Sequence, residues 1–278
     1  MNESTGGGPA GTDDTGTRTV PRCPSSSGRI TDYLLGGRTN YAEDRQVAER
    51  LLTAWPLARA AARERRVHLR QTLAAHAAAG TVQVLDLGSG MPLGRMYGLL
   101  DAHHALAHAS PASASTTVYI DIDPDVATHL DALHDPVGGH RVHSREADIR
   151  VPGLLPALYQ DAVLDPARPV AVVLADVLQE FDDEQVHHLL AALASNLAPG
   201  STLTLTHPSP SPDACARLAL VYSSAGIAWH PRTSGQAADL LADWLRSPAT
   251  DVTEEQGFWA ATGTVGRAPR PDHDKGRS

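Results

Sequence analysis

The stretch Val82-Gln83-Val84-Leu85-Asp86-Leu87-Gly88-Ser89-Gly90 decides the fold. Its first part reads as a short buried strand that ends in an acidic residue. A Gly-x-Gly turn follows at once, and Pro92 is placed to open a helix. A glycine turn between a parallel strand and a helix lets the backbone approach a ligand and directs the free N–H groups of the helix towards it. The stretch therefore predicts a nucleotide-type binding site.

Composition limits the classes of protein that the chain can belong to. Of its 278 residues 42% are hydrophobic, which is enough for a sizeable core, while only 4% are aromatic. The formal net charge of −9 argues against nucleic acid as the main partner, because binding to phosphates needs a basic face. A cationic or neutral small molecule fits better. Lys275 is the single lysine, and with the abundant alanine this suggests a GC-rich bacterial genome.

Cysteine usage and hydropathy bear on the location of the protein. The chain has two cysteines, Cys23 and Cys215, which make neither a disulfide framework nor a metal set and suggest a reducing cytoplasm. The longest apolar stretch, around residues 170–174, is too short to span a bilayer, and no leader-like segment opens the chain. We therefore expect a cytoplasmic protein without a membrane partner.

The chain divides into four regions by composition. Residues 1–24 and 267–278 are rich in polar residues and Gly or Pro, and we expect both to be disordered tails. Residues 25–80 read as an N-terminal helical cap. Residues 81–266 read as the main ligand-binding domain.

Within the cap, turn and capping residues suggest where helices begin and end. Gly36-Gly37 fits a helix C-cap, and Asn40 fits the N-cap of a helix that runs to Trp55. A further helix is expected over residues 57–79. The charged run at residues 63–66 within it reads as a solvated face.

Carboxylates end successive strands of the main domain. Asp121 follows one strand, Asp148 lies in the turn after the next, and Asp176 ends the most continuous apolar strand. Two late candidate strands, 249–253 and 257–265, form an antiparallel hairpin. The pattern predicts an α/β fold: a Rossmann-like, doubly wound, seven-stranded, mostly parallel sheet with an antiparallel C-terminal hairpin and the helical cap.

Asp121 is the carboxylate with the clearest ligand role. Asp123 and Pro124 already supply the N-cap and first residue of the next helix, which leaves Asp121 without a capping task. A carboxylate at the tip of the second strand of a doubly wound sheet is where ribose hydroxyls are bound. The structural alternative is a solvated strand end.

A nicotinamide enzyme is the first alternative for such a site. Its fingerprint is Gly-x-Gly-x-x-Gly with an acidic residue about 20 positions further on. Here Leu93 stands where the third glycine belongs, and Asp121 comes about 30 residues after Gly90. Asp86 would place a negative charge beside a pyrophosphate, but it suits a ligand with an ammonium group and a sulfonium.

Histidine pairs do not indicate a metal site. His104 and His108 stand four residues apart, yet no third ligand with suitable spacing is evident, and the same holds for His187 and His188. We expect no metal.

Several motifs resemble those of the class I S-adenosylmethionine-dependent methyltransferases. They are Leu85–Gly90, Tyr119–Pro124, Ala147–Arg150 and Leu197–Gly200. In addition, Asp32–Tyr41 with Asp44-Arg45 resembles the N-terminal signature of an actinobacterial methyltransferase family formerly of unknown function.

The resemblance implies S-adenosylmethionine as the cofactor and a set of residues around it. These are Tyr33, Arg38, Asn40, Asp86, Gly88, Ser89, Gly90, Asp121, Ile122, Asp148, Ile149, Ala175 and Asp176. The glycine turn would line the methionine part, with Asp86 near the amino group, and Asp121 would hold the ribose. Ile122 and Asp148 would flank and meet the adenine, and the segment that carries Tyr33 would fold over the cofactor.

Methyl transfer makes few demands on catalytic groups, because the sulfonium is already activated and positioning supplies much of the acceleration. A base is needed only if the acceptor loses a proton. Glu180, His207 and Tyr33 are the candidates by expected location. Their structural alternatives are a helix-entry charge, a strand-end turn and cap packing. The family usually has a histidine and then an aromatic after the fourth strand, where this chain reads Gln179-Glu180-Phe181.

The expected function is methyl transfer to a small molecule, and the family resemblance suggests specialised metabolism. A second class stays open, because a fold does not fix a reaction. The chain could be an S-adenosylmethionine-binding enzyme of the cyclase or lyase type that transfers no methyl group, or a cofactor-binding regulatory protein.

Overall fold

The computed structural model describes residues 24–92, 115–132, 140–246, 253–255 and 257–266. Several expectations lie outside these residues. They are both disordered tails apart from Pro24, the helix from Pro92 towards His108 with its histidine pair, and most of the strand expected at 249–253.

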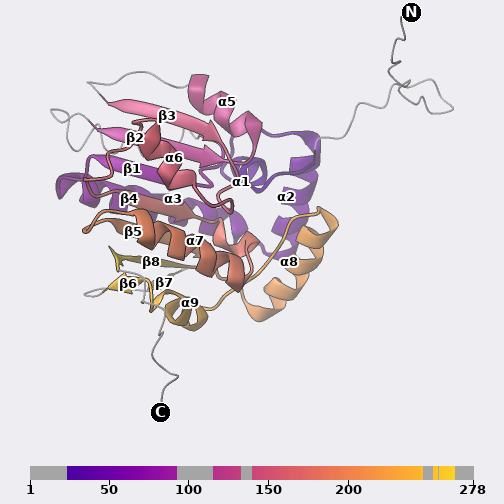
Figure 1. Cartoon of the computed structure of the whole chain (residues 1–278). Helices are drawn as coiled ribbons and strands as arrows, with labels where there is room; N and C mark the ends of the chain where they lie inside the picture. Colours follow the sequence, from indigo (N-terminus) through magenta and orange to yellow (C-terminus); the bar gives the residue numbers. More distant parts are fainter. Residues whose placement is uncertain (1–23, 93–114, 133–139, 247–252, 256, 267–278) are drawn as a thin grey trace, which may run out of the picture.

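A mixed sheet forms the centre of the molecule (Figure 1). Its strands are β1 (Gln83–Leu87), β2 (Thr116–Asp121), β3 (Arg141–Glu146), β4 (Ala171–Ala175), β5 (Thr202–Pro208), β6 (Leu245–Arg246), β7 (Thr253–Glu255) and β8 (Phe258–Val265). The order is β3-β2-β1-β4-β5-β8-β6, and β7 also pairs with β8. Strands β1 to β5 are parallel, whereas β8 runs antiparallel to β5, β6 and β7.

This arrangement confirms the Rossmann-like, mostly parallel sheet with an antiparallel C-terminal pair. The count of seven strands is not confirmed: the described residues form eight, of which six are five residues or longer. The difference comes from β6 and β7, which have two and three residues and pair only with β8. Such short edge strands leave little hydrophobic pattern to read.

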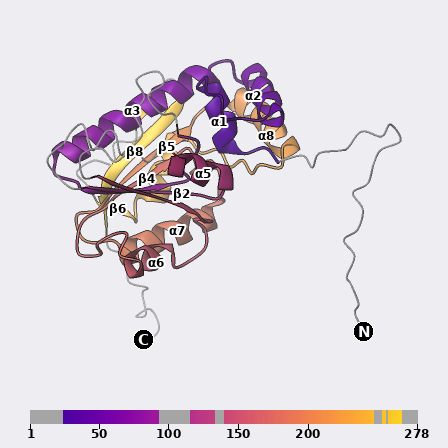
Figure 2. The ribbon, with the colours of Figure 1, turned by 90° about the horizontal axis from the view of Figure 1, so that it is seen from above.

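Helices cover both faces of the sheet, with α3 on one side and α6 and α7 on the other (Figure 2). The helices are α1 (Ser27–Leu34), α2 (Ala42–Ala54), α3 (Ala58–Ala78), α5 (Pro124–Ala132), α6 (Leu154–Gln160), α7 (Asp183–Asn196), α8 (Pro212–Ser224) and α9 (Ser234–Leu241), with a 3₁₀ turn at Leu178–Glu180. Helix α6 is not among the helices expected from the sequence. Asp182 and Ser211 are the N-caps of α7 and α8, since each side chain accepts a hydrogen bond from the first turn of its helix.

Three apolar clusters hold the layers together. One packs α6, α7 and α9 on one face of the sheet, and another packs α5 and the second half of α3 on the opposite face. The third joins α1, α2, α8 and the start of α3 at the end of the sheet. Strand β1 is buried along its whole length, as its apolar run predicts. Each fully buried Leu or Val in these clusters contributes about 1.5–3 kcal/mol to stability.

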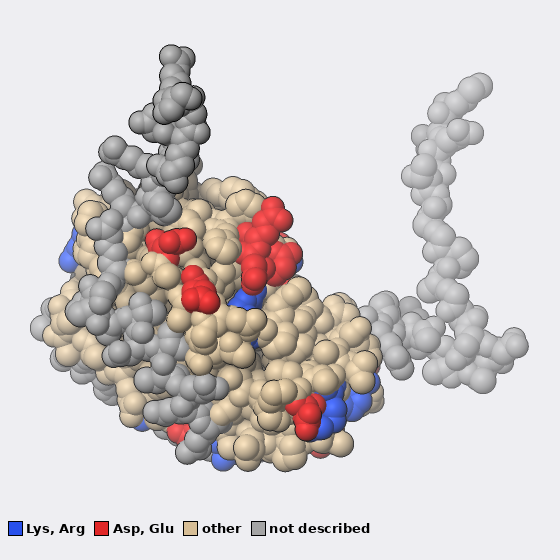
Figure 3. Space-filling model, turned by 90° about the horizontal axis from the view of Figure 1, so that it is seen from below, with Lys and Arg blue, Asp and Glu red and all other residues tan. Residues whose placement is uncertain are grey.

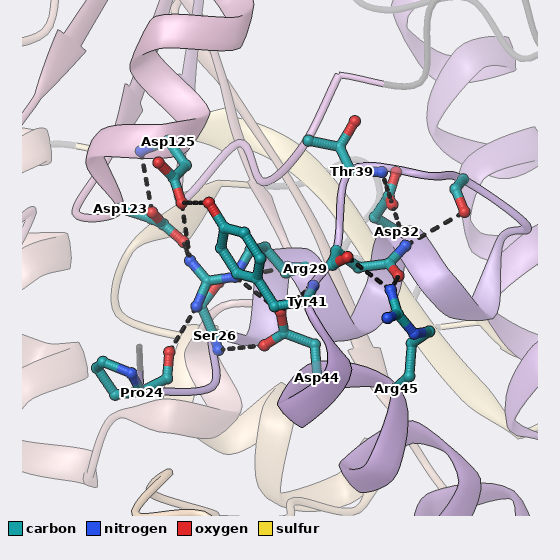
Figure 4. A network of polar contacts seen from close by, with 12 residues as sticks. Pro24, Ser26, Arg29, Asp32, Thr39, Tyr41, Asp44, Arg45, Asp123 and Asp125 are labelled. Atoms are coloured by element: carbon teal, nitrogen blue, oxygen red, sulfur yellow. Dashed lines mark hydrogen bonds and ion pairs between the residues drawn. The ribbon is translucent and has the colours of Figure 1, made fainter. Parts of the chain in front are cut away.

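A buried ion-pair network ties the cap to the sheet (Figure 4). The Arg29 guanidinium donates from Nε to Asp44 Oδ2 at 2.8 Å and from Nη1 to Asp123, the N-cap of α5. All three side chains are buried, and Tyr41 lies against the guanidinium with its ring centre 5.1 Å away. Because a buried charge is tolerated only when it is paired, this network fixes the cap beside the tip of β2.

Polar residues of the signature at Asp32–Tyr41 form hydrogen bonds with one another inside the cap. One oxygen of Asp32 accepts hydrogen bonds from the backbone N–H of Thr39 and from the side chain of Asn40, at 2.9 and 2.7 Å. A Cβ on Gly37 would lie 1.9 Å from Asp32 Oδ1, so only glycine fits there. The expectation that Asn40 caps α2 is wrong by one residue: Tyr41 is the N-cap, because Asn40 is held by Asp32.

Candidate functional site

The glycine turn after β1 is bound to the tip of β2. Gly88 and Gly90 have φ values of 71° and 65°, in the left-handed region that favours glycine. The N–H groups of Gly88 and Ser89 donate to the carbonyl of Ile120 at 2.8 and 3.1 Å. A Cβ on Gly88 would lie 2.6 Å from Val177, so the turn packs directly on the segment after β4.

Asp121 stands at the centre of this junction. Its Oδ2 accepts from the N–H of Gly90 at 2.8 Å, and its Oδ1 accepts from the N–H of Asp123 at 2.9 Å. Burial raises the pKa of this carboxyl, against the opposite effect of these backbone hydrogen bonds. The carboxylate is thus held in one orientation and keeps lone pairs for a ligand.

A cavity of about 360 Å³ opens at the carboxyl ends of the parallel strands. This is within the volume range of small-molecule sites. Nine of the expected cofactor residues line it, namely Gly88, Ser89, Gly90, Asp121, Ile122, Asp148, Ile149, Ala175 and Asp176. The cap supplies another wall through residues 25–28 and Thr31, and the loop at 226–228 supplies a third.

The charges around the cavity favour a cation. Five carboxylates and two guanidinium groups line it. Three of the carboxylates form ion pairs with arginine: Asp123 pairs with Arg29, Asp148 with Arg150 and Asp176 with Arg65. Asp121 and Glu180 are the other two, and Arg66 is the remaining guanidinium, so one negative charge is left that a positive ligand would offset.

Four expected cofactor residues do not line the cavity. Asp86 is buried within β1, 4% exposed, and pairs in register with Tyr119 and Val173. Asn40 is engaged by Asp32, and Arg38 is exposed on the same loop.

Tyr33 also points away from the cavity. Its hydroxyl donates to Glu49 at 2.5 Å, and Arg59 lies over its ring. The reason is the register of α1, which turns Thr31 and Gly28 towards the cavity and Tyr33 towards α2.

The three candidate bases differ in whether they line the cavity. Glu180 lines the cavity, where burial raises its pKa and a hydrogen bond from Ser27 opposes that shift. His207 lies outside it, fully buried and stacked on Trp259 with ring centres 4.7 Å apart. Burial lowers the pKa of His207 to about 4. Neither His207 nor Tyr33 lines the cavity. Of the three candidates, Glu180 alone has its side chain in the cavity wall.

The charged run at residues 63–66 of α3 is expected from the sequence to be a solvated face, and this expectation is wrong for part of the run. Arg63 and Glu64 are exposed, but Arg65 is buried and donates from Nε to Asp176 Oδ2 at 2.6 Å. Arg66 lines the cavity, with its Nη2 3.8 Å from where a Cβ on Gly90 would lie. The residue types of the run do not distinguish its exposed members from Arg65 and Arg66, because their burial depends on how α3 packs against the strand tips.

Asp176 is held in a strained backbone conformation. Its φ is 55°, unusual for a residue with a side chain, and Thr206 Oγ1 donates to its Oδ1 at 2.9 Å. With Arg65 on the other oxygen, the carboxylate has two fixed partners. Strain of this kind persists where the surroundings over-determine it, commonly at ligand sites.

The described residues contain no group of three or more His, Cys, Asp or Glu side chains suited to a metal, and none of their helices is long and apolar enough to cross a membrane. On the face drawn in Figure 3, most of the described surface belongs to residues other than Lys, Arg, Asp and Glu. Several acidic groups lie close together, other acidic groups lie apart from them, and Lys and Arg occur singly or in small groups.

Comparison with known proteins assigns the family. The family model described as S-adenosyl methyltransferase matches residues 15–248. A protein of the DUF574 family from Streptomyces avermitilis is 25% identical, with a TM-score of 0.76 over 88% of this chain and 98% of that one. A Thermobifida fusca protein assigned as a methyltransferase is 29% identical, with a TM-score of 0.73 over 88% and 96%.

No curated protein matches the chain significantly. The family model nevertheless covers most of the sequence, including the glycine turn, β2 and the segment after β4 that together build the cavity. The chain therefore belongs to the S-adenosyl methyltransferase family and is an S-adenosylmethionine-dependent methyltransferase.

Proposed function

We propose that the 360 Å³ cavity binds S-adenosylmethionine and that the chain methylates a small molecule held beside it. The observation that carries the proposal is the enclosure of this cavity between the strand tips, the cap and the loop at 226–228. Walls on these three sides support a small acceptor over a folded macromolecular surface.

The lining residues suit the parts of the cofactor. Asp121 is placed to accept the ribose hydroxyls, as strand-tip carboxylates do in doubly wound folds. Ile122 is 58% exposed although it is apolar, and an adenine ring against it would remove that surface from water. Arg66, beside Gly90, is the group that would pair with the methionine carboxylate. Asp148 and Ile149 would meet the adenine edge.

When bound, the cofactor supplies a methyl group already activated by a positive sulfonium. The protein then has to orient the acceptor and exclude water, which the cap wall at 25–28 and the glycine turn do. Glu180 is the proposed proton acceptor, because it lines the cavity and burial raises its pKa, which makes its carboxylate a stronger base.

The proposal also covers the biological setting. A role in specialised metabolism follows from the resemblance of the cap signature alone. A cytoplasmic location is supported by the free thiol of Cys215 among the described residues, since reducing compartments keep thiols free. Cell fractionation tests that part.

Calorimetric titration tests the cofactor site. S-adenosylmethionine and S-adenosylhomocysteine should bind, NADH should not, and Asp121→Ala should abolish the signal. Asp161→Ala is the matched control, because Asp161 is an exposed carboxylate paired with Arg145 away from the cavity. Binding of NADH alone, or equal binding by both variants, would refute the site.

Acceptor screening tests the reaction. Candidate small molecules are incubated with the protein and S-adenosylmethionine, and release of S-adenosylhomocysteine is followed. Glu180→Gln should reduce turnover of a hydroxyl acceptor while leaving cofactor binding intact. Conversion of the cofactor-bound substrate without release of S-adenosylhomocysteine would instead support the cyclase or lyase type of enzyme.

A further inference from the structure

A second, smaller cavity adjoins the first. It has a volume of about 30 Å³ and shares Ser27, Thr31 and Asp176 with the larger one. Its remaining walls come mainly from the apolar cluster of the cap and α8, including Ile30, Trp55 and others. This volume is large enough to hold a polar group the size of a water molecule.

Two side chains in its wall have buried polar atoms that find no hydrogen-bond partner among the described residues. They are Nη1 of Arg65, whose residue is 5% exposed, and Oε1 of Gln179, whose residue is 6% exposed. Leaving a buried polar atom unpaired costs about 1–3 kcal/mol, more when the group is charged. Such atoms at a cavity wall therefore indicate a missing ligand group or water.

Asp176 orients both side chains. Its Oδ2 accepts from Arg65 Nε at 2.6 Å, and its backbone carbonyl accepts from Gln179 Nε2 at 2.5 Å. The guanidinium and the amide are therefore each fixed at one end. Nη1 of Arg65 is then the unused donor, and Oε1 of Gln179 is the unused acceptor. Both side chains line the same small cavity.

The charge of the pair selects among ligand groups. Because Arg65 is already neutralised by Asp176, the cavity offers an anion little net attraction. A carboxylate would have no proton for Gln179 Oε1, and an ammonium would have no lone pair for Arg65 Nη1. A hydroxyl has both, and it is the smallest group that does.

We propose that this cavity receives a hydroxyl group of the methyl acceptor, and that the acceptor is an uncharged, mainly apolar molecule. The hydroxyl donates to Gln179 Oε1 and accepts from Arg65 Nη1, while the apolar body lies along the wall shared with the cofactor cavity. This inference rests on the proposed function, because it places the acceptor beside the bound cofactor.

The test uses the whole chain saturated with S-adenosylhomocysteine and four one-ring probes. Phenol carries a hydroxyl, and toluene carries no polar group. Benzoate carries a carboxylate, and benzamide carries a carboxamide, a larger group that both donates and accepts hydrogen bonds. Binding is measured by ligand-observed NMR titration. Phenol should bind about tenfold more tightly than toluene, in line with two recovered hydrogen bonds, and more tightly than benzoate or benzamide.

Two variants locate the hydroxyl. Arg65→Lys keeps a cation for Asp176 but lacks the second N–H direction, and Gln179→Met removes the acceptor at similar volume. Each should weaken phenol about tenfold and leave toluene unchanged, with every variant kept saturated with S-adenosylhomocysteine. Arg50→Lys is the control, because Arg50 is exposed and binds Ser224 on α8 outside both cavities.

The outcomes separate the two proposals. Failure of S-adenosylhomocysteine to bind the wild-type chain would refute the proposed cofactor site. If it binds but phenol gains nothing over toluene, the polar atoms are served by water and the inference fails. Tighter binding of benzoate or benzamide than phenol would also overturn it. The wild-type probe series decides this even if a variant does not fold.

Discussion

Arg29 of the first helix donates to Asp123 at the tip of β2, across 94 residues of sequence. The same guanidinium holds Asp44 of α2, so one buried cation binds two elements of the cap to the start of α5. Asp123 in turn donates its N–H to Asp121, the carboxylate at the centre of the cavity. The position of the cap is thus linked to the proposed ribose site through two consecutive interactions.

Arg29→Met should therefore destabilise the protein severely. The change leaves two buried carboxylates without their partner, which costs about 3–5 kcal/mol in the free energy of unfolding. Urea titration followed by far-UV circular dichroism measures it. Arg45→Met, which removes an exposed arginine that binds only Asn40, should cost less than about 1 kcal/mol. Equal losses in the free energy of unfolding would show that the buried network stabilises the protein no more than the exposed contact of Arg45 does.

Gly37→Ala tests why the cap signature contains its second glycine. The added Cβ would meet Asp32 at 1.9 Å, so we expect a loss of about 1–3 kcal/mol or more from overpacking. Gly235→Ala in α9 is the control, because its Cβ would have no neighbour nearer than 3.9 Å, and it should be neutral or slightly stabilising.

A double-mutant cycle sharpens this prediction. In an Asp32→Ala background the clash disappears, so Gly37→Ala should cost clearly less there than in the wild-type chain, by about 0.5–3 kcal/mol. Thermal unfolding of the four proteins gives the coupling. Additive effects would mean that the glycine is required for some other reason than its contact with Asp32.

His207→Phe should change the acid stability of the protein but not its methyl transfer. The folded-state pKa of about 4 lies below the unfolded value of 6.5, so the unfolded chain binds more protons between these pH values. Stability is therefore lost as pH falls through this window, by on the order of 3 kcal/mol from this group.

Phe keeps the stacking on Trp259 and removes the titration. Urea unfolding at pH 7, 5.5 and 4.5 should show a smaller decline for His207→Phe than for the wild type. The control is His188→Gln, an exposed histidine on α7. A decline as steep as in the wild type would contradict the buried, neutral state of His207.

Cofactor binding should depend on pH through Asp121. Its pKa is raised by burial above the ordinary 3.8, and the charged form is the one that accepts two hydroxyl donors. Affinity should therefore rise as pH increases through that raised value, with release of a proton on binding. Asp121→Asn should weaken binding at pH 7 by about tenfold or more, the range of hydrogen bonds to a charged group.

Titration calorimetry at pH 5 in two buffers of different ionisation enthalpy measures the proton release. Asp121→Asn should release fewer protons than the wild type, while Asp161→Asn should match it. Identical proton release in all three proteins would place the titrating group elsewhere, with Glu180 as the next carboxyl to vary.

The predictions from sequence succeeded where local chemistry decides the structure. A strand followed by Gly88-Ser89-Gly90 has few alternatives, because positive φ angles recur there. Parallel strands bring their carboxyl ends to one edge, so Asp121 lines the cavity as the alternation of strands and helices implies.

They failed where long-range packing decides it. Arg65 meets Asp176 across 111 residues, and nothing in the charged run of α3 distinguishes it from its exposed neighbour Arg63. Tyr33 and Asn40 are polar residues in a distinctive motif, which suggested contact with a ligand. Their partners lie within the cap instead, and that choice depends on how α1 packs on α2.

Strand β1 divides the sheet into two halves, with β2 and β3 on one side and β4 and β5 on the other. The wall of the cavity draws on both halves, through Asp121 from one and Asp176 from the other. A polypeptide cut between α6 and β4 would give two fragments, each with an incomplete site. For such fragments the methyl donor would act as an assembly ligand, and the complementation of two separately expressed pieces would depend on its concentration.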